Sequence, residues 1–275
     1  MTRDPRYDIL FEPIKIGPVT AKNRFYQVPH CTGMGYTRPN TVNKMREMTA
    51  EGGWGVVNTE YCSIHPSANE DPYPQCTLWD EGDVNNMSKM VEGVHRHGAL
   101  AGVQLWYGGF ASGNQLTREN SLAPTSMPAW HGVGQTQAMD KTDIANLRKW
   151  HRDAALRAKR SGYDIVYVYA AHGYLPAQFL SRVENTRTDE YGGSFENRAR
   201  LIRELLIDTK EAIGDSCAVA FRFAVDNLDR DLGITFDGEG RELVEYLADV
   251  PDLWDVNLAN FEADARTSRF APEAA

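Results

Sequence analysis

The sequence predicts an α/β fold of the (β/α)8 TIM-barrel type, with about six βα units after an N-terminal hairpin. Short apolar, β-branched runs alternate strictly with amphipathic helical stretches, which predicts a parallel sheet with right-handed crossovers. A doubly wound dinucleotide-binding sheet competes with the barrel, but no G-x-G-x-x-G motif follows the first strand. The 275 residues suit one domain over residues 1–275, and because the tail RFAPEAA offers no closing strand, we expect an incomplete barrel.

Composition and charge disfavour several classes of protein. The chain is 42% hydrophobic and 24% charged, and its formal net charge of −9 argues against nucleic acid or an anionic membrane as the main partner. No window approaches the roughly 18 apolar residues of a membrane span, and no signal-peptide pattern is present, so we expect a cytoplasmic location. The four cysteines form no C-x-x-C pair, so local spacing predicts neither a disulfide framework nor a metal site.

The first elements follow from turn signals and apolar runs. A Gly17-Pro18 turn signal between apolar residues predicts a hairpin over residues 10–23 that could plug the bottom of a barrel. Strands are predicted over residues 24–29 (RFYQVP) and 56–60 (VVNTE), with a helix around residues 44–50 between them.

The next unit has clearer boundaries. Asp83 is predicted to cap a helix whose valines and methionines share one face, and Gly98 is predicted to end it. Residues 99–105 (ALAGVQL) then form the third strand. The connection over residues 106–139 is rich in Gly, Ser, Pro and Asn, and loops of this length usually lie over a site.

Three further units complete the pattern. Asp140 or Thr142 starts a helix that Gly162 closes, Ser194 caps the next helix, and the last helix lies around residues 240–247. The strands of these units are residues 165–169 (IVYVY), 218–223 (AVAFRF) and 254–258 (WDVNL).

Chemically active side chains gather after these strands. In barrel enzymes the active site lies at the carboxyl ends of the strands, so candidates can be collected there from sequence. The set combines an amide able to read a pyrimidine edge, an arginine able to stabilise negative charge on a reduced ring, and aromatic walls, which indicates a flavin site. In chain order the candidates are His30, Cys31, Glu60, Tyr61, Gln104, Trp106, Tyr169, His172, Tyr174, Arg222, Phe261 and Asp264.

Several long blocks resemble known enzymes. KNRF, GVQLWYGG, FRF and RTDEYGGSFENR (residues 187–198) resemble the Old Yellow Enzyme group of FMN barrels. More narrowly, NRFYQVPHC, AEGGWGVVNTEYCSI and GYDIVYVYAAHGYLP resemble the trimethylamine, dimethylamine and histamine dehydrogenase branch. The blocks match in order over essentially the whole chain, so the resemblance is specific for the family and less so for the substrate.

The resemblance implies FMN as the cofactor. In the VPHC block (Val28, Pro29, His30 and Cys31), it implies that Cys31 is joined to flavin C6 as a 6-S-cysteinyl thioether. The alternative is a buried structural cysteine, the commoner fate of an unpaired cysteine.

The remaining cofactor contacts come from three strand ends. Gln104 and Arg222 match contacts to the flavin pyrimidine ring and N1, and an arginine in a strand as apolar as AVAFRF should be costly without an anionic partner. Glu60 is a further cofactor-binding candidate, although Glu60, Trp106 and His30 are also explained by packing at the barrel rim.

The catalytic set implied by the resemblance is Tyr169, His172 and Asp264, with Tyr174 beside them. An amine is mostly an ammonium ion at neutral pH and needs ionisable groups that manage its proton before C–H oxidation. Ordinary hydrogen bonding to backbone at the barrel rim is the alternative for the tyrosines and histidine. Enoate reductases of the wider group usually carry His-x-x-His or His-x-x-Asn here, so Tyr-x-x-His favours amine oxidation.

The resemblance also implies aromatic walls around the substrate. Tyr61 matches one wall of an aromatic bowl that holds an alkylammonium ion through cation–π attraction, and Phe261 lies where a tryptophan is expected for the second wall.

These implications define the expected function. We expect oxidative N-dealkylation or deamination of a small amine, with hydride transfer to flavin N5. The alternatives are an NAD(P)H-dependent ene-reductase and a non-catalytic barrel remnant. The resemblance also implies a 4Fe-4S cluster and an ADP- or FAD-type nucleotide site C-terminal to the barrel, an electron-transfer flavoprotein-like acceptor, and a homodimer.

Overall fold

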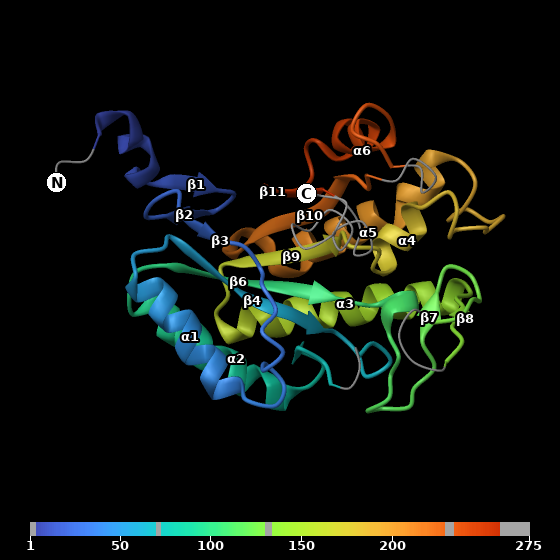
Figure 1. Ribbon diagram of the computed structural model, residues 1–275, viewed down its shortest axis with the longest axis horizontal. Coiled ribbons are helices and arrows are strands. Elements are labelled where there is room, and N and C mark those ends of the chain that lie inside the picture. Colours follow the sequence, from blue (N-terminus) through green and yellow to red (C-terminus); the bar gives the residue numbers. More distant parts are fainter. Residues whose placement is uncertain (1–3, 70–72, 130–133, 229–233, 259–275) are drawn as a thin grey trace, which may run out of the picture.

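A curled parallel sheet forms the framework of the protein (Figure 1). The structure is a computed structural model that describes residues 4–69, 73–129, 134–228 and 234–258. Neighbours in the sheet are also successive strands of the predicted βα units, so the predicted alternation is confirmed. From one edge to the other the strands are β3 (Tyr26–Gln27), β4 (Val56–Ser63), β6 (Leu100–Trp106), β9 (Ile165–Ala170), β10 (Ala218–Asp226) and β11 (Leu253–Leu258), with β5 (Cys76–Thr77) paired beside β4.

Helices cover the outer face of this sheet (Figure 1). Their apolar stripes pack against the outward residues of the strands in one large hydrophobic cluster that includes Val166, Phe221 and Leu205. No helix in the described part of the chain is both long and apolar enough to cross a membrane. The helices are α1 (Pro39–Glu51), α2 (Glu81–His95), α3 (Lys141–Ser161), α4 (Leu175–Leu180), α5 (Phe195–Ile213) and α6 (Glu239–Leu247), with 3-10 turns η1 (Pro5–Phe11), η2 (Gly109–Ala111) and η3 (Gly214–Ser216).

The helix caps mostly agree with the sequence. Asp140 caps α3 through a capping box, and Gly162 ends it with a left-handed φ of 93°. Ser194 caps α5 as predicted. The prediction that Asp83 caps α2 is wrong, because Asp80 is the N-cap and Asp83 is the N3 residue of the same capping box. Both residues are aspartates, so residue type alone did not separate the two roles.

The predicted hairpin closes the end of the sheet where the strands begin (Figure 1). Strands β1 (Ile14–Ile16) and β2 (Val19–Ala21) pair in antiparallel register. Ile16 and Ala21 join a second hydrophobic cluster with the first residues of several strands, such as Val56 and Ile165. The prediction of a plug at the bottom of the barrel is therefore confirmed.

The long connection after β6 lies at the opposite end, where the strands finish (Figure 1). It contains η2 and a short parallel pair, β7 (Leu122–Ala123) and β8 (Gln137–Ala138), which the sequence did not predict. Two-residue strands carry too little periodicity to be recognised in a polar loop. Among the described strands, β3 and β11 are the edges of the main sheet, so its inner face opens between them.

Candidate active site

Five aromatic side chains meet at the carboxyl ends of β4, β6 and β9. The rings of Tyr61 and Trp106 stack with centroids 4.3 Å apart, and Tyr174 meets Trp106 edge-on at 5.3 Å. Tyr169 lies 5.2 Å from Tyr174, and His172 lies 5.8 Å from Tyr169. We call these five residues the aromatic cluster. The sequence placed all five after three separate strands, and the fold brings them into one contiguous group.

Tyr169 and His172 form the polar contact of the cluster. The Tyr169 hydroxyl lies 2.5 Å from Nδ1 of His172, within hydrogen-bond distance. His172 holds a left-handed φ of 56°, an uncommon conformation for a residue other than glycine that is often found at functional sites. Burial, aided by the positive charge of Arg222, lowers the pKa of His172 to about 4. Burial also raises the pKa of Tyr169. Near neutral pH the pair therefore consists of a neutral imidazole and a protonated phenol.

Arg222 joins the cluster to the next two strands. It lies in register with Tyr169 on β9 and with Asp255 on β11, so the three side chains form a row across the sheet. The guanidinium lies 5.7 Å from the Tyr169 ring centroid, and its Nε lies 3.5 Å from Oδ2 of Asp255. It also donates to the carbonyl of Pro29 at 2.9 Å and to Oδ1 of Asn257 at 3.3 Å. The anionic partner that the sequence required is thus Asp255.

Asp255 and Asn257 are polar partners that we did not predict from the sequence. They alternate in WDVNL, which places both on the same face of β11. Burial raises the pKa of Asp255, and the charge of Arg222 acts in the opposite direction. A period-two pattern of polar residues in a short strand was the signal that could have identified them.

The VPHC block crosses the ends of the strands after β3. Its Pro29 is buried, whereas Val28, His30 and Cys31 are exposed. The backbone N–H of His30 donates to the carbonyl of Thr59 at 3.3 Å, which fixes the block against β4. The side chain of Cys31 is therefore presented at the surface of the same end of the sheet as the aromatic cluster.

Glu60 is turned toward this block. The side chain is 1% exposed, and its Oε1 accepts the backbone N–H of Thr32 and, at 2.6 Å, the Thr32 hydroxyl. The contacts assign Glu60 a direct part in holding the loop after Cys31. Its role as a cofactor ligand stays a prediction.

Several buried polar atoms at this end of the sheet have no hydrogen-bond partner among the described residues. They include several donors, and a buried donor without a partner costs about 1–3 kcal/mol. A polar, planar ligand that accepts hydrogen bonds would satisfy them, as the pyrimidine part of a flavin does. The donor atoms outside ion pairs are Gln104 Nε2, Trp106 Nε1 and Asn257 Nδ2.

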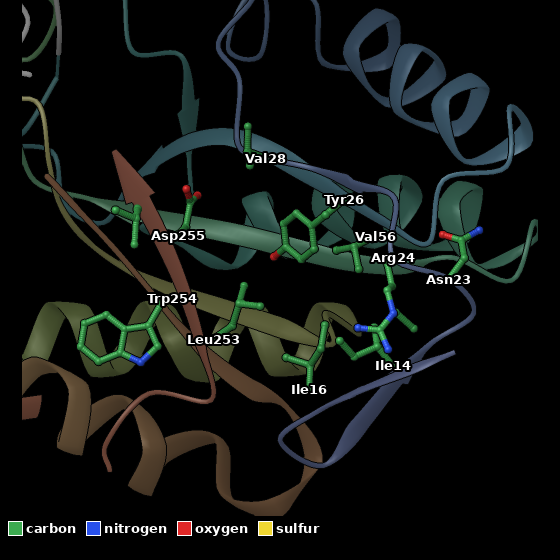
Figure 2. Close-up of a pocket in the computed structure, with 12 residues that line it drawn as sticks. Ile14, Ile16, Asn23, Arg24, Tyr26, Val28, Val56, Leu253, Trp254 and Asp255 are labelled. Carbon is green, nitrogen blue, oxygen red and sulfur yellow. The ribbon is translucent and has the colours of Figure 1, made fainter. Parts of the chain in front are cut away.

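A cavity of about 360 Å³ opens on the inner face of the sheet, between the edges β3 and β11 (Figure 2). Ile14 and Ile16 of the hairpin, Tyr26 of β3, and Leu253 and Asp255 of β11 line it. The residues lining it include none of the aromatic cluster. One of its lining residues, Asp255, is however the ion-pair partner of Arg222.

Two predicted site residues, Phe261 and Asp264, lie outside the described residues. Within the described ranges, no three His, Cys, Asp or Glu side chains are grouped in a way that could hold a metal ion.

Known proteins resemble this chain along most of its length. A dimethylamine dehydrogenase of Hyphomicrobium sp. (strain x) is 43% identical over 99% of this chain. The structure of 6-hydroxypseudooxynicotine amine oxidase from Pseudomonas geniculata N1 matches 94% of the chain with 50% identity and a TM-score of 0.92. That of histamine dehydrogenase from Rhizobium sp. 4-9 matches 94% with 46% identity and a TM-score of 0.89.

The chain spans only part of each of these proteins: 38% of the dimethylamine dehydrogenase, 39% of the amine oxidase and 38% of the histamine dehydrogenase. The family model of the NADH:flavin oxidoreductase / NADH oxidase family matches residues 9–275, almost the whole sequence. The chain therefore belongs to the NADH:flavin oxidoreductase / NADH oxidase family.

Proposed function

We propose that this protein is an FMN-dependent oxidoreductase that oxidises a small amine by N-dealkylation or deamination. The observation that carries the proposal is the Tyr169–His172 contact, which lies beside Arg222 within an aromatic cluster. Relatives whose names include dimethylamine dehydrogenase, histamine dehydrogenase and an amine oxidase support the same substrate class. We further propose that residues 1–275 form one FMN-binding TIM-barrel domain that is incomplete, as the sequence leads us to expect.

The unpartnered Nε2 of Gln104 and the positive charge of Arg222 suit the polar edge of the flavin ring. FMN, when bound, would supply the two-electron acceptor of the reaction. Arg222 would keep positive charge beside the ring, and the VPHC block, with Cys31 as the proposed point of covalent attachment, would line its edge. The site would then supply hydrogen-bond donors, a cation and a nucleophile to the ring.

The aromatic cluster would hold the substrate. Faces of Tyr61 and Tyr174 attract an alkylammonium ion by roughly 0.5–2 kcal/mol per contact. Burial of that cation favours loss of its proton to solvent, and the neutral His172, whose Nδ1 accepts from the Tyr169 hydroxyl, can donate from Nε2 to the lone pair of the resulting amine. Tyr169 fixes the orientation of His172 through their hydrogen bond. Phe261 as a second wall and Asp264 as a third catalytic residue belong to the same proposal.

Other parts of the proposal rest on the resemblance. These are the 4Fe-4S cluster, the ADP- or FAD-type nucleotide site, the electron-transfer flavoprotein-like acceptor, the homodimer and the cytoplasmic location. They concern the complete protein and its partners.

Product analysis tests the proposed reaction. Full-length protein with bound FMN and an artificial electron acceptor should convert dimethylamine to formaldehyde and methylamine, or histamine to an aldehyde and ammonia. Aldehyde is measured by derivatisation and mass spectrometry. Absence of aldehyde together with NADPH-dependent reduction of an enone would instead establish the ene-reductase alternative suggested by the family name. Absence of both activities would support a non-catalytic barrel.

A further inference from the structure

Three buried, charged side chains contact the chain on both sides of Cys31. Arg222 of β10 donates to the carbonyl of Pro29 at 2.9 Å. Arg46 of α1 donates through Nη2 to the carbonyl of His30. On the other side, Glu60 of β4 accepts both the N–H and the hydroxyl of Thr32. Cys31 is thus held between fixed neighbours supplied by three separate elements.

Arg46 is an unexpected residue at this place. It lies on α1, a helix to which the sequence analysis assigned no site residue, yet it is only 5% exposed. Its Nε and Oε2 of Glu60 both lack hydrogen-bond partners in the described structure, although the two residues are close enough for their charges to interact. Keeping a buried guanidinium this incompletely paired is costly, which indicates a task beyond packing.

Charges of both signs lie near Cys31, so some stabilise its thiolate form and others oppose it. Burial lowers the pKa of Arg46, and the negative charges of Glu60 and of a Cys31 thiolate oppose that shift. By reciprocity, the charge of Arg46 stabilises the Cys31 thiolate. Arg222 adds positive charge on the other side of the block but is itself paired with Asp255.

We propose that Arg46 is a positioning residue that holds Cys31 at the flavin edge and favours its thiolate form, with Glu60 moderating this effect. The inference rests on the proposed function in one respect, namely that flavin is the group Cys31 joins. A thiolate is the nucleophilic form of cysteine, so its population sets how readily Cys31 reacts. The ionisable groups around Cys31 are His30 on its own segment, Arg46 on α1, Glu60 on β4, Tyr169 on β9 with His172 beyond it, and Arg222 on β10 with its partner Asp255 on β11.

Thiol alkylation tests the inference without using the reaction. The full-length protein is produced under riboflavin depletion so that Cys31 stays unmodified, and its alkylation by iodoacetamide is followed by mass spectrometry from pH 5 to 10. The buried Cys62 and Cys217 in the same samples report any general unfolding. Arg46→Met should raise the pH midpoint for Cys31 and slow its alkylation about tenfold at pH 7, the effect of one pKa unit.

Glu60→Gln is the matched variant, because glutamine can still accept from Thr32 while the opposing charge is removed. Its midpoint should move in the opposite direction, toward lower pH, and Arg46→Lys should largely restore the wild-type value. A purely structural role predicts shifts of the same sign in both variants. That result, or unchanged midpoints, would overturn the inference. If Arg46→Met does not fold, Arg46→Lys and Glu60→Gln still give the sign.

Flavin retention separates this inference from the proposed function. With FMN present, acid precipitation of the wild-type protein should retain the yellow flavin, and Arg46→Met should retain a smaller fraction. Wild-type protein that retains none contradicts covalent attachment to Cys31. The alkylation midpoints then still decide the role of Arg46 on their own.

Discussion

The hydroxyl of Tyr169 and Nδ1 of His172 lie 2.5 Å apart at the carboxyl end of β9, buried beside Arg222. One loop residue with a left-handed φ is what turns the imidazole back onto its own strand. This contact connects the aromatic cluster to the row formed by Tyr169, Arg222 and Asp255. The proposed chemistry depends on it.

Replacing Tyr169 tests the role of this contact. Tyr169→Phe removes the hydroxyl but keeps the ring, so we expect the rate of amine oxidation to fall by about 10²-fold or more, as for loss of a proton-managing group. Tyr167→Phe is the matched control, because Tyr167 loses an equally short contact, 2.5 Å to the hydroxyl of Tyr26, away from the cluster. Equal losses of rate in both variants would show a general structural effect. Single-turnover kinetics with saturating amine make the comparison.

The Arg222–Asp255 pair should be costly to break from one side. Their side chains are 11% and 10% exposed, so Arg222→Met or Asp255→Asn should each lower the free energy of unfolding by about 3–5 kcal/mol. The double variant should lose clearly less than the sum, because neither buried group is then left alone. The exposed Glu245 beside Arg241 is the control, and Glu245→Gln should cost under about 1 kcal/mol. Additive losses in urea unfolding would contradict direct coupling.

Buried histidines should make the protein acid-sensitive. Burial lowers the pKa of His151 to about 4, and an unfolded histidine titrates near 6.5. Between these values the unfolded chain binds a proton that the native state does not, so stability falls as the pH falls from about 6.5 to 4, by up to about 3 kcal/mol. His151→Asn should flatten that slope.

His95 is the control, because its pKa is shifted upward whereas that of His151 is shifted downward. The hydrogen bond to Asp164 raises the pKa of His95, so the stabilisation by His95 is present below pH 6.5 and is lost as the pH rises through its raised value. His95→Gln should therefore leave the slope below pH 6.5 unchanged and abolish the loss of stability above it. Urea unfolding measured from pH 4 to 8 distinguishes them, and identical slopes in both variants would exclude this account.

Gly102 leaves room for the side chain of Asn58, which connects β4 to β3 by a hydrogen bond. A Cβ at this position of β6 would overlap Oδ1 of Asn58, whose Nδ2 donates to the carbonyl of Gln27 at 2.6 Å. Gly102→Ala should lower the free energy of unfolding by about 1–3 kcal/mol through overpacking. Gly134→Ala, with no neighbour within 4 Å, should change it by less than about 0.5 kcal/mol. A neutral Gly102→Ala would mean that Asn58 moves freely.

Most of the fold could be predicted because local patterns decide it. The strand over residues 165–170 is buried throughout and reads as a continuous apolar run, and the caps Asp140 and Ser194 follow residue type. One of the elements that escaped prediction, the β7–β8 pair, is formed by contacts between distant segments of a polar loop. Local residue patterns do not indicate such a pairing.

The site was predictable in part for the same reason. The aromatic cluster and Arg222 could be identified from their positions at the strand ends, because barrel topology alone brings these residues together. Asp255 and Arg46 were missed, since their importance depends on which side chain faces them across β10 and on which way a helix turns. Cross-strand register and helix rotation are properties of the assembled fold.

Anaerobic spectroscopy of the bound flavin tests the central claim most directly. Full-length protein with FMN is mixed without oxygen with dimethylamine or histamine in one cell and with NADPH in another, and the flavin absorbance is recorded. We predict that an amine bleaches the flavin within seconds to minutes and that NADPH does not. Bleaching by NADPH with no response to any amine would contradict the claim that this chain carries an amine-oxidising site.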